Sequence, residues 1–197
     1  MASLATTAFQ LETTSTALQS LPTGAYLVHA TNCLGEWGAG FALELRGIFP
    51  GAYVEYRAYC DSFKTNAEAR FATRDLVGRC YIIPPQDEDV AAGAPRLSIV
   101  CLFSSHGYGR ANRAKGKPGL DRPPLVLSQT KQALDDFRKQ LDQRSRSDEG
   151  CPFPEVYSPM FNSGAFKVPW AKTSALIREC FKGWEGRWIV LEPPSRK

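Results

Sequence analysis

The chain has 197 residues, of which 43% are hydrophobic, and its 24 basic and 20 acidic side chains leave a formal net charge of +4. A chain of this length can bury one core, so we expect a single domain over residues 1–197 and not two. The small positive charge favours anionic ligands but is far below that of a dedicated nucleic-acid-binding protein.

Short apolar runs bounded by Gly or Pro predict strands along the chain. These runs are Tyr26–Ala30, Cys80–Ile83, Leu97–Phe103, Val156–Phe161 and Trp188–Leu191. Helical spacing of apolar residues predicts helices between them, at Phe41–Phe49, Thr130–Leu141 and Thr173–Phe181. Strands that alternate with helices predict an α/β domain, with helices on both faces of a mixed, mainly parallel sheet. In such sheets ligands bind beyond the carboxyl ends of the strands.

Two segments lack a periodic pattern. Ser104–Pro124 is rich in Gly, Pro and basic residues, so we expect a solvated, partly disordered insertion. The alternative is that its cluster Arg110–Arg122 contacts phosphate or RNA, although nucleic-acid binding is not expected. Arg144–Pro154 is a second charged linker. Asp87–Asp89 follows two prolines, so we interpret it as a solvated turn and not as a magnesium-binding group.

The six cysteines are scattered, without a Cys-x-x-Cys pair or a nearby histidine, so no metal site and no cofactor are expected. None is followed by arginine at the Cys-x5-Arg spacing, which excludes a cysteine phosphatase. No stretch approaches the roughly 18 apolar residues of a membrane span, and the first residues lack the features of a leader peptide. We therefore expect a reduced, cytoplasmic or nuclear protein without a membrane partner, and a monomer.

The first candidate ligand loop is "HATNCLGEWGAG", residues 29–40, between a predicted strand and a predicted helix. Gly38, Ala39 and Gly40 are small enough for a ligand to approach the backbone, and their N–H groups can face an anion at the helix N-terminus. A tight turn without a ligand explains the glycines equally well. The spacing matches neither the dinucleotide fingerprint nor a Walker loop.

The second candidate loop lies within "FNSGAFKVPWAKT", residues 161–173, again between a strand and a helix. Ser163 and Gly164 can turn backbone N–H groups inward, and Phe166 offers an apolar wall for a sugar ring. Two such loops on one sheet suggest a ligand with more than one phosphate.

These two motifs in this order resemble the ligand-binding loops of the macrodomain family, in its fungal branch of yeast-like ADP-ribose 1''-phosphate phosphatases. "CLFSSHGYGR" (101–110) and the Phe49–Tyr56 segment resemble the same branch, and the likeness spans about Leu27 to Phe181. The resemblance implies a three-layer α/β/α fold, and ADP-ribose and ADP-ribose 1''-phosphate as partners. It also implies a substrate formed downstream of tRNA splicing.

The resemblance also implies roles for particular residues. Asn32 would bind the distal ribose, with Gly38, Ala39 and Gly40 beside it and the adjoining phosphate. The second loop would wrap the diphosphate. Its predicted ligand residues are Asn162, Ser163, Gly164, Ala165, Phe166 and Lys167.

The chain departs from the family pattern at three places. The aspartate that usually follows the first strand and recognises adenine is absent, and Glu12 is the nearest acid. Relatives that remove ADP-ribose from glutamate use a lysine and an aspartate, where this chain has serine at 104 or 105 and Phe166. Lys167 replaces a glycine of the yeast-like loop and adds a charge beside the phosphates.

His29 is the candidate catalytic residue, as a base that activates water for attack on a terminal phosphate. A structural histidine at a strand end is the competing interpretation, and His106 is the weaker candidate. The sequence therefore predicts a metal-independent phosphomonoesterase. Two alternatives stay open: a non-catalytic reader of ADP-ribose, and a hydrolase that removes ADP-ribosyl groups from protein or nucleic acid.

Overall fold

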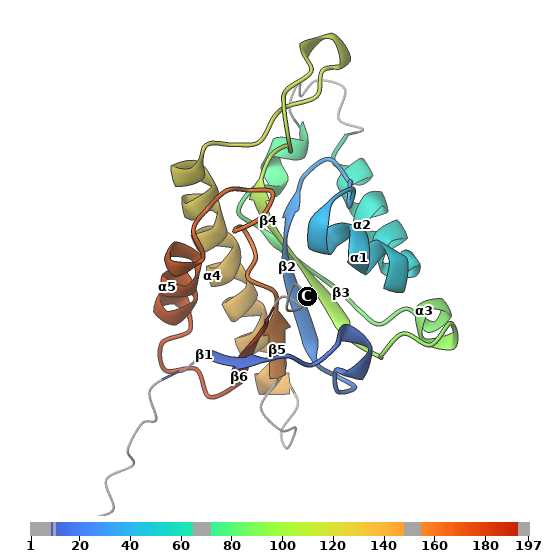
Figure 1. Ribbon diagram of the computed structural model, residues 1–197, viewed down its shortest axis with the longest axis vertical. Coiled ribbons are helices and arrows are strands. Elements are labelled where there is room, and N and C mark those ends of the chain that lie inside the picture. Colours follow the sequence, from blue (N-terminus) through green and yellow to red (C-terminus); the bar gives the residue numbers. More distant parts are fainter. Residues whose placement is uncertain (1–8, 10, 65–71, 148–154, 193–197) are drawn as a thin grey trace, which may run out of the picture.

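A single mixed sheet forms the centre of the computed structural model, which describes residues 9, 11–64, 72–147 and 155–192 (Figure 1). Its strand order is β1-β6-β5-β2-β4-β3. The strands are β1 (Leu11–Thr14), β2 (Tyr26–Asn32), β3 (Cys80–Ile83), β4 (Ser98–Ser105), β5 (Glu155–Ser158) and β6 (Arg187–Leu191). All neighbours run parallel except β3, which is antiparallel to β4. The predicted mixed, mainly parallel sheet is confirmed.

Helices cover both faces of this sheet (Figure 1). One layer contains α1 (Gly40–Ile48) and α2 (Pro50–Ser62), with the short α3 (Asp87–Ala91) beside α2. The other layer contains α4 (Pro123–Ser147) and α5 (Trp170–Cys180), which pack against each other. Single 3-10 turns lie at η1 (Leu18–Ser20), η2 (Ala72–Leu76) and η3 (Arg113–Lys115). The architecture is the three-layer α/β/α domain that the sequence predicts.

The central strand β2 is buried on both faces, which explains its nearly unbroken apolar sequence. Successive side chains point to opposite faces of a strand. Leu27 packs in the cluster with α1 and α2, whereas Val28 packs in the cluster with α4 and α5. His29 lies one step beyond Val28, so its imidazole falls on the α1 side of the sheet and contacts Trp37.

Two elements escape prediction because their signals are weak. The strand β1 (LETT) is polar, as an edge strand that pairs only with β6 can be. Helix α2 lacks a clear apolar stripe, because Tyr53, Tyr56 and Cys60 form much of its buried side.

The expectation of a solvated turn at Asp87–Asp89 is wrong. These residues begin α3, and Asp89 is 2% exposed. Its carboxylate accepts hydrogen bonds from the N–H groups of Gly51 (2.7 Å) and Ala52 (3.0 Å). Asp89 therefore pairs with free N–H groups in the first turn of α2 from outside the helix. This contact joins segments far apart in the sequence, so no local sequence pattern predicts it.

The segment expected to be a partly disordered insertion is shorter and more ordered than the sequence suggests. Ser104 and Ser105 complete β4, and α4 begins at Pro123, so the irregular part is 106–122. Within it Asn112 and Lys117 pair through two N–H···O bonds of 2.9 Å.

The charged linker is also shorter than expected. Helix α4 continues to Ser147, while 148–154, which include Cys151, lie outside the described residues. The other five cysteines are free thiols. None of the helices in the described part of the chain is long and apolar enough to cross a membrane.

Candidate functional site

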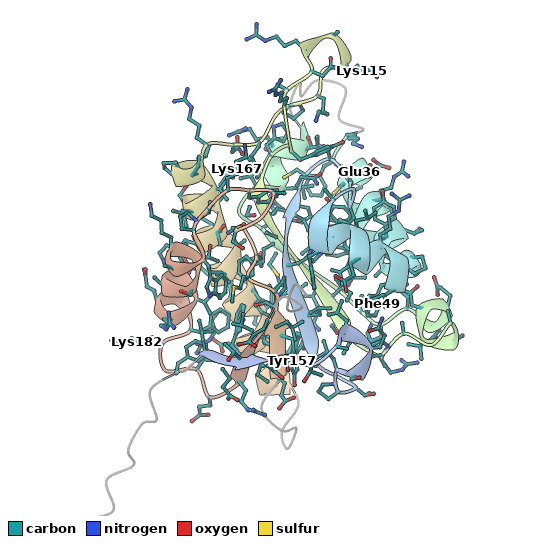
Figure 2. All side chains as sticks on the ribbon, viewed as in Figure 1. Glu36, Phe49, Lys115, Tyr157, Lys167 and Lys182 are labelled. Atoms are coloured by element: carbon teal, nitrogen blue, oxygen red, sulfur yellow. The ribbon has the colours of Figure 1, made fainter. Side chains whose placement is uncertain are left out.

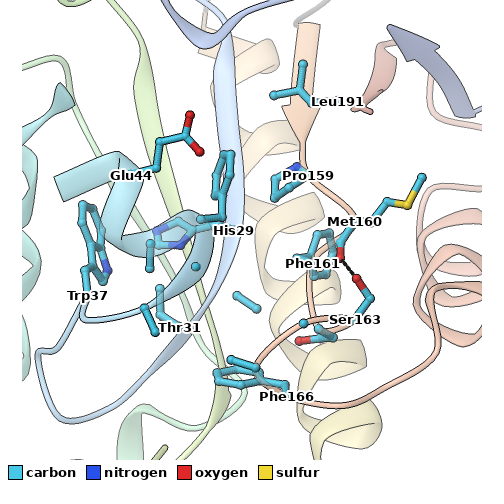
Figure 3. Close-up of a pocket in the computed structure, with 18 of the residues that line it drawn as sticks. His29, Thr31, Trp37, Glu44, Pro159, Met160, Phe161, Ser163, Phe166 and Leu191 are labelled. Carbon is cyan, nitrogen blue, oxygen red and sulfur yellow. Dashed lines mark hydrogen bonds between the residues drawn. The ribbon is translucent and has the colours of Figure 1, made fainter. Parts of the chain in front are cut away.

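A cavity of about 970 Å³ opens at the carboxyl ends of β2 and β5, between the segments that follow these two strands (Figure 3). His29 lines it, and so does every predicted ligand residue except Lys167. These ligand residues are Asn32, Gly38, Ala39, Gly40, Asn162, Ser163, Gly164, Ala165 and Phe166. The fold thus brings both candidate loops to one cavity.

Asn32 organises the first loop from the end of β2. Its side-chain amide donates to the carbonyl oxygen of Glu36 (2.7 Å), and its Oδ1 accepts from the N–H of Leu34 (2.9 Å). The hydroxyl of Tyr56 donates to the Asn32 carbonyl oxygen at 2.7 Å and lies 3.3 Å from Oδ1. Asn32 is 6% exposed. Its amide therefore fixes the loop while one edge of the residue faces the cavity.

The first loop ends at the N-terminus of α1, which points at the cavity. Gly40 has φ 54°, in the left-handed region that disfavours residues with a Cβ. Ala39 precedes the helix in an extended conformation, and no described side chain caps the first turn. The leading N–H groups of α1 are therefore available to an anion, with the helix dipole in support.

The second loop presents three consecutive backbone N–H groups. Its internal hydrogen bonds are Ser163 N to Met160 O, Lys167 N to Gly164 O, and Val168 N to Asn162 O. Within the described chain the N–H groups of Gly164, Ala165 and Phe166 have no such partner. The Ser163 hydroxyl also donates to the carbonyl oxygen of Met160 (Figure 3). Unpaired N–H groups in this arrangement can donate to phosphate oxygens.

Asn162 anchors the second loop from below and is 4% exposed. Its amide donates to the hydroxyl oxygens of Thr130 (2.9 Å) and Thr173 (3.5 Å), and its Oδ1 accepts from the hydroxyl of Ser104 (3.2 Å). Its backbone adopts φ 66°, which asparagine tolerates better than most residues. The side chain thus positions the loop, while the backbone of Asn162 borders the cavity.

Lys167 lies apart from the other predicted ligand residues. Its side chain is exposed and does not line the cavity. Its φ of 57° shows that the loop keeps a left-handed residue here although glycine is missing.

His29 is 2% exposed, and burial lowers the pKa of its imidazole to about 3. Its ring meets the indole of Trp37 edge-on, with ring centres 4.8 Å apart, and its Nε2 lies 3.8 Å from the Sγ of Cys101. The histidine is therefore uncharged at neutral pH and able to accept a proton. His106, the weaker candidate, lies outside the cavity lining, and its Nε2 is 3.0 Å from the Thr73 hydroxyl.

Several residues of this cavity were not predicted from the sequence. Glu44 on α1 and Tyr108 in the segment after β4 both line it. Trp37 lines it too, and the buried indole N–H of Trp37 has no hydrogen-bond partner in the described chain. Helical spacing from Gly40 to Glu44 is the one signal that could have placed Glu44 on the cavity side of α1.

The far end of the cavity is formed by residues after β1 and at the end of β6. Ser15–Gln19 and Leu191 line this end, whereas Phe166 lies at the opposite end from Leu191 (Figure 3). Glu12 does not line the cavity, and its carboxylate pairs with Arg187 at 2.6 Å. The carboxylate of Glu12 thus joins β1 to β6 through this ion pair.

The described residues contain no group of three or more His, Cys, Asp or Glu side chains that could hold a metal ion. Ser104, one of the two serines expected near the lysine position of related hydrolases, is buried in β4, bonds to Asn162 and does not line the cavity.

Several solved structures with this fold are macrodomains. The macrodomain of Mycobacterium tuberculosis DarG superposes with a TM-score of 0.62 over 95% of this chain and 99% of its own, at 16% identity. Thermosipho africanus DarTG, solved in complex with ADP-ribose, superposes with a TM-score of 0.62 over 96% of this chain and 44% of its own, at 14% identity. The chain therefore has the macrodomain fold. No family model matches the sequence.

Proteins of similar sequence show to which family of macrodomains the chain belongs. A Neosartorya fischeri protein named ADP-ribose 1''-phosphate phosphatase is 32% identical over 80% of this chain and 84% of its own length. The Saccharomyces cerevisiae protein of the same name is 29% identical over 78% of this chain and 82% of its own. The chain belongs to the family of fungal ADP-ribose 1''-phosphate phosphatases.

Proposed function

We propose that this protein hydrolyses the terminal phosphate of ADP-ribose 1''-phosphate, giving ADP-ribose and inorganic phosphate without a metal ion. The observation that carries the proposal is the pair of loops with unpaired N–H groups on either side of one cavity. A ligand with several phosphates satisfies both loops at once. The names of the sequence relatives and the ADP-ribose complex of the structural neighbour support the same ligand class.

The charges around the cavity orient such a ligand. Glu44 and Glu192 line the cavity, Glu192 directly after Leu191 and Glu44 at the same end in Figure 3, and phosphates are repelled from their carboxylates. The loop N–H groups and the basic segment after β4 lie toward the other end, beside Asn32 and Phe166. The uncharged adenine ring therefore occupies the Leu191 end of the cavity. The distal ribose with its terminal phosphate occupies the Asn32 end.

This orientation supplies a carboxylate for the adenine amino group despite the missing aspartate. Glu44 makes no ion pair with a described residue, whereas Glu36, also in the lining, lies 3.6 Å from Arg46. In Figure 3 the Glu44 carboxylate is drawn at the same end of the cavity as Leu191. We expect Glu44→Gln to weaken ADP-ribose binding more than it weakens binding of inosine diphosphate ribose, which lacks this amino group.

The proposed chemistry needs a base and a site for developing charge. His29 accepts a proton from water as the water attacks phosphorus, and the N–H groups stabilise the phosphate oxygens. The P–O bond to the ribose breaks, and the proton taken up by His29 passes to the leaving oxygen, which becomes the hydroxyl of ADP-ribose. A pKa of about 3 makes the free imidazole a weak base. A dianionic phosphate beside it favours the protonated form, so substrate binding raises this pKa toward a useful value.

The test is phosphate release from ADP-ribose 1''-phosphate with a chelator present, together with calorimetry of ADP-ribose on the same sample. We expect release in the chelator, and His29→Gln should lower kcat by about 100-fold while ADP-ribose still binds. His106→Gln is the matched control, because His106 is the other histidine and does not line the cavity.

The other outcomes separate the alternatives. Binding without release would leave a non-catalytic ADP-ribose reader or a hydrolase of ADP-ribosyl groups, and turnover unchanged in His29→Gln would remove His29 from the mechanism.

A further inference from the structure

The segment 106–122 after β4, named here the basic arm, is a built structure. A Cβ atom on Gly107 would overlap the carbonyl oxygen of Pro118, and one on Gly119 would lie 2.8 Å from the N of Ala111. The two sides of the arm therefore touch backbone to backbone, where only glycine fits. The N–H of Leu120 also donates to Gly109 O at 3.0 Å. Figure 1 shows the arm beyond the ends of β2 and β4.

The base of the arm is attached to both ligand loops. The carbonyl oxygen of His106 accepts from the N–H of Cys33 (3.0 Å), the residue after Asn32. At the other end of the arm, Leu120 packs against the cluster that contains Phe166 of the second loop. Asp121 closes the base, since its carboxylate accepts from the N–H of His106 at 2.8 Å. The arm therefore begins and ends at the Asn32 end of the cavity.

Tyr108 carries the arm into the cavity lining, and Lys117 rests on it. The Lys117 ammonium lies 3.9 Å from the centre of the Tyr108 ring and donates to the Tyr108 carbonyl oxygen at 2.8 Å. This cation–π contact and hydrogen bond fix a positive charge behind a wall of the cavity. Lys117 has no acidic partner within 4 Å in the described chain, so its charge is not neutralised.

We propose that Tyr108 and Lys117 form a specificity subsite for the terminal phosphate of the substrate. Tyr108 closes the cavity next to the distal ribose, and Lys117 gives this wall a positive potential that favours the phosphorylated ligand over ADP-ribose. The inference rests on the proposed function, because it assigns the phosphate to the Asn32 end of the same cavity. It also gives a role to one lysine of the basic arm that needs no nucleic acid.

The decisive variant is Lys117→Met, which keeps an unbranched apolar stem and removes the charge. Because Lys117 acts on a dianion through the Tyr108 wall, we expect kcat/KM for ADP-ribose 1''-phosphate to fall by about 5–10-fold, chiefly through KM. The Kd of ADP-ribose should change less than about twofold, since that ligand leaves the subsite empty. Lys117→Arg should restore most of the loss and shows that the arm still folds.

Lys115→Met is the matched control. Lys115 is exposed at the tip of the same arm, remote from Lys167 and Glu36 near the sheet (Figure 2), and it does not touch Tyr108. We expect this variant to behave as wild type. The proposal is overturned if Lys117→Met weakens both ligands equally, or if Lys115→Met has the same effect, because charge at a distance would then be the cause.

A failure of the proposed function is distinguishable from a failure of this subsite. If wild type releases no phosphate, calorimetry with ADP-ribose 1''-phosphate and with ADP-ribose measures the preference directly. A preference for the phosphorylated ligand that is present in wild type and lost in Lys117→Met supports the subsite without any turnover. A preference that is absent from wild type, or kept in Lys117→Met, overturns it.

Discussion

The two ligand loops follow neighbouring strands and present N–H groups to one cavity, yet they are held in place differently. In the first loop the side chain of Asn32 bonds to the nearby Leu34 and Glu36. Longer-range bonds with Tyr56 and His106 hold the backbone of this loop at Asn32 and Cys33. The second loop is fixed from below, where Asn162 joins β4, α4 and α5 through three hydroxyl groups. The asparagine side chain of the first loop thus bonds mainly to its own loop, whereas that of the second loop bonds to three other elements.

This difference predicts that the second loop is the more sensitive of the two. We expect Asn162→Ala to lower the free energy of unfolding by about 2–4 kcal/mol. The substitution leaves buried hydroxyl groups unpaired. It also places alanine at φ 66°, a left-handed conformation that asparagine tolerates better. ADP-ribose affinity should fall by about tenfold as the loop loosens, a change of 1.4 kcal/mol. Urea unfolding and calorimetry on the same preparation measure the two effects.

Asn162→Gly is the control for backbone strain, since glycine accepts the positive φ. A loss equal to that of Asn162→Ala assigns the effect to the missing hydrogen bonds, whereas a much smaller loss assigns it to strain. Stability within about 0.5 kcal/mol of wild type in both variants would contradict the anchor itself.

The local bonds of the Asn32 side chain in the first loop should cost less to remove. Asn32→Ala is expected to destabilise the protein by about 2 kcal/mol, because Leu34 and Glu36 can recover water as partners more easily than buried hydroxyl groups can. Asn32→Asp keeps the acceptor for Leu34 and loses the donor to Glu36, so it separates the two bonds. Destabilisation greater than that of Asn162→Ala would reverse the proposed order of the two loops.

The strand before the first loop adds a pH dependence that the second loop lacks. His29 has a pKa of about 3 in the folded protein against 6.5 for an unperturbed imidazole. As the pH falls below 6.5, His29 binds a proton in the unfolded chain, whereas in the folded protein it binds one only near pH 3. Stability is therefore fully present above pH 6.5, and His29 removes about 1.4 kcal/mol of it per pH unit below that value.

The measurement is the free energy of unfolding of wild type and His29→Gln at pH 7, 6, 5 and 4. Carboxylates titrate equally in both proteins, so the difference between the two slopes isolates His29. Parallel slopes would show that the imidazole is not buried uncharged.

The contrast between local and long-range contacts also explains how much the sequence could predict. The strands β2 and β4 are apolar because both of their faces are buried, which made the fold class predictable. The glycines and asparagines of the two loops stand in recognisable sequence motifs, which made the cavity predictable. The buried role of Asp89 was not, because it bonds to N–H groups of a helix far away in the sequence. Tyr108 was missed for a similar reason, since its segment looks like solvent-exposed chain until Gly107 and Gly119 are seen to pack.

The smallest effect concerns the one predicted ligand residue that lies outside the cavity lining. Lys167 holds φ 57°, a conformation that costs a residue with a Cβ about 1 kcal/mol relative to glycine. Lys167→Gly should therefore stabilise the loop by up to that amount in a denaturant titration. If its exposed ammonium acts only at long range, ADP-ribose affinity at 0.15 M salt should stay within about twofold of wild type, because charges beyond about 8 Å are screened. A larger loss of affinity, growing as salt is lowered, would show that Lys167 turns toward the phosphates on binding, and the second loop would then recognise its ligand through a side chain as well as through its backbone.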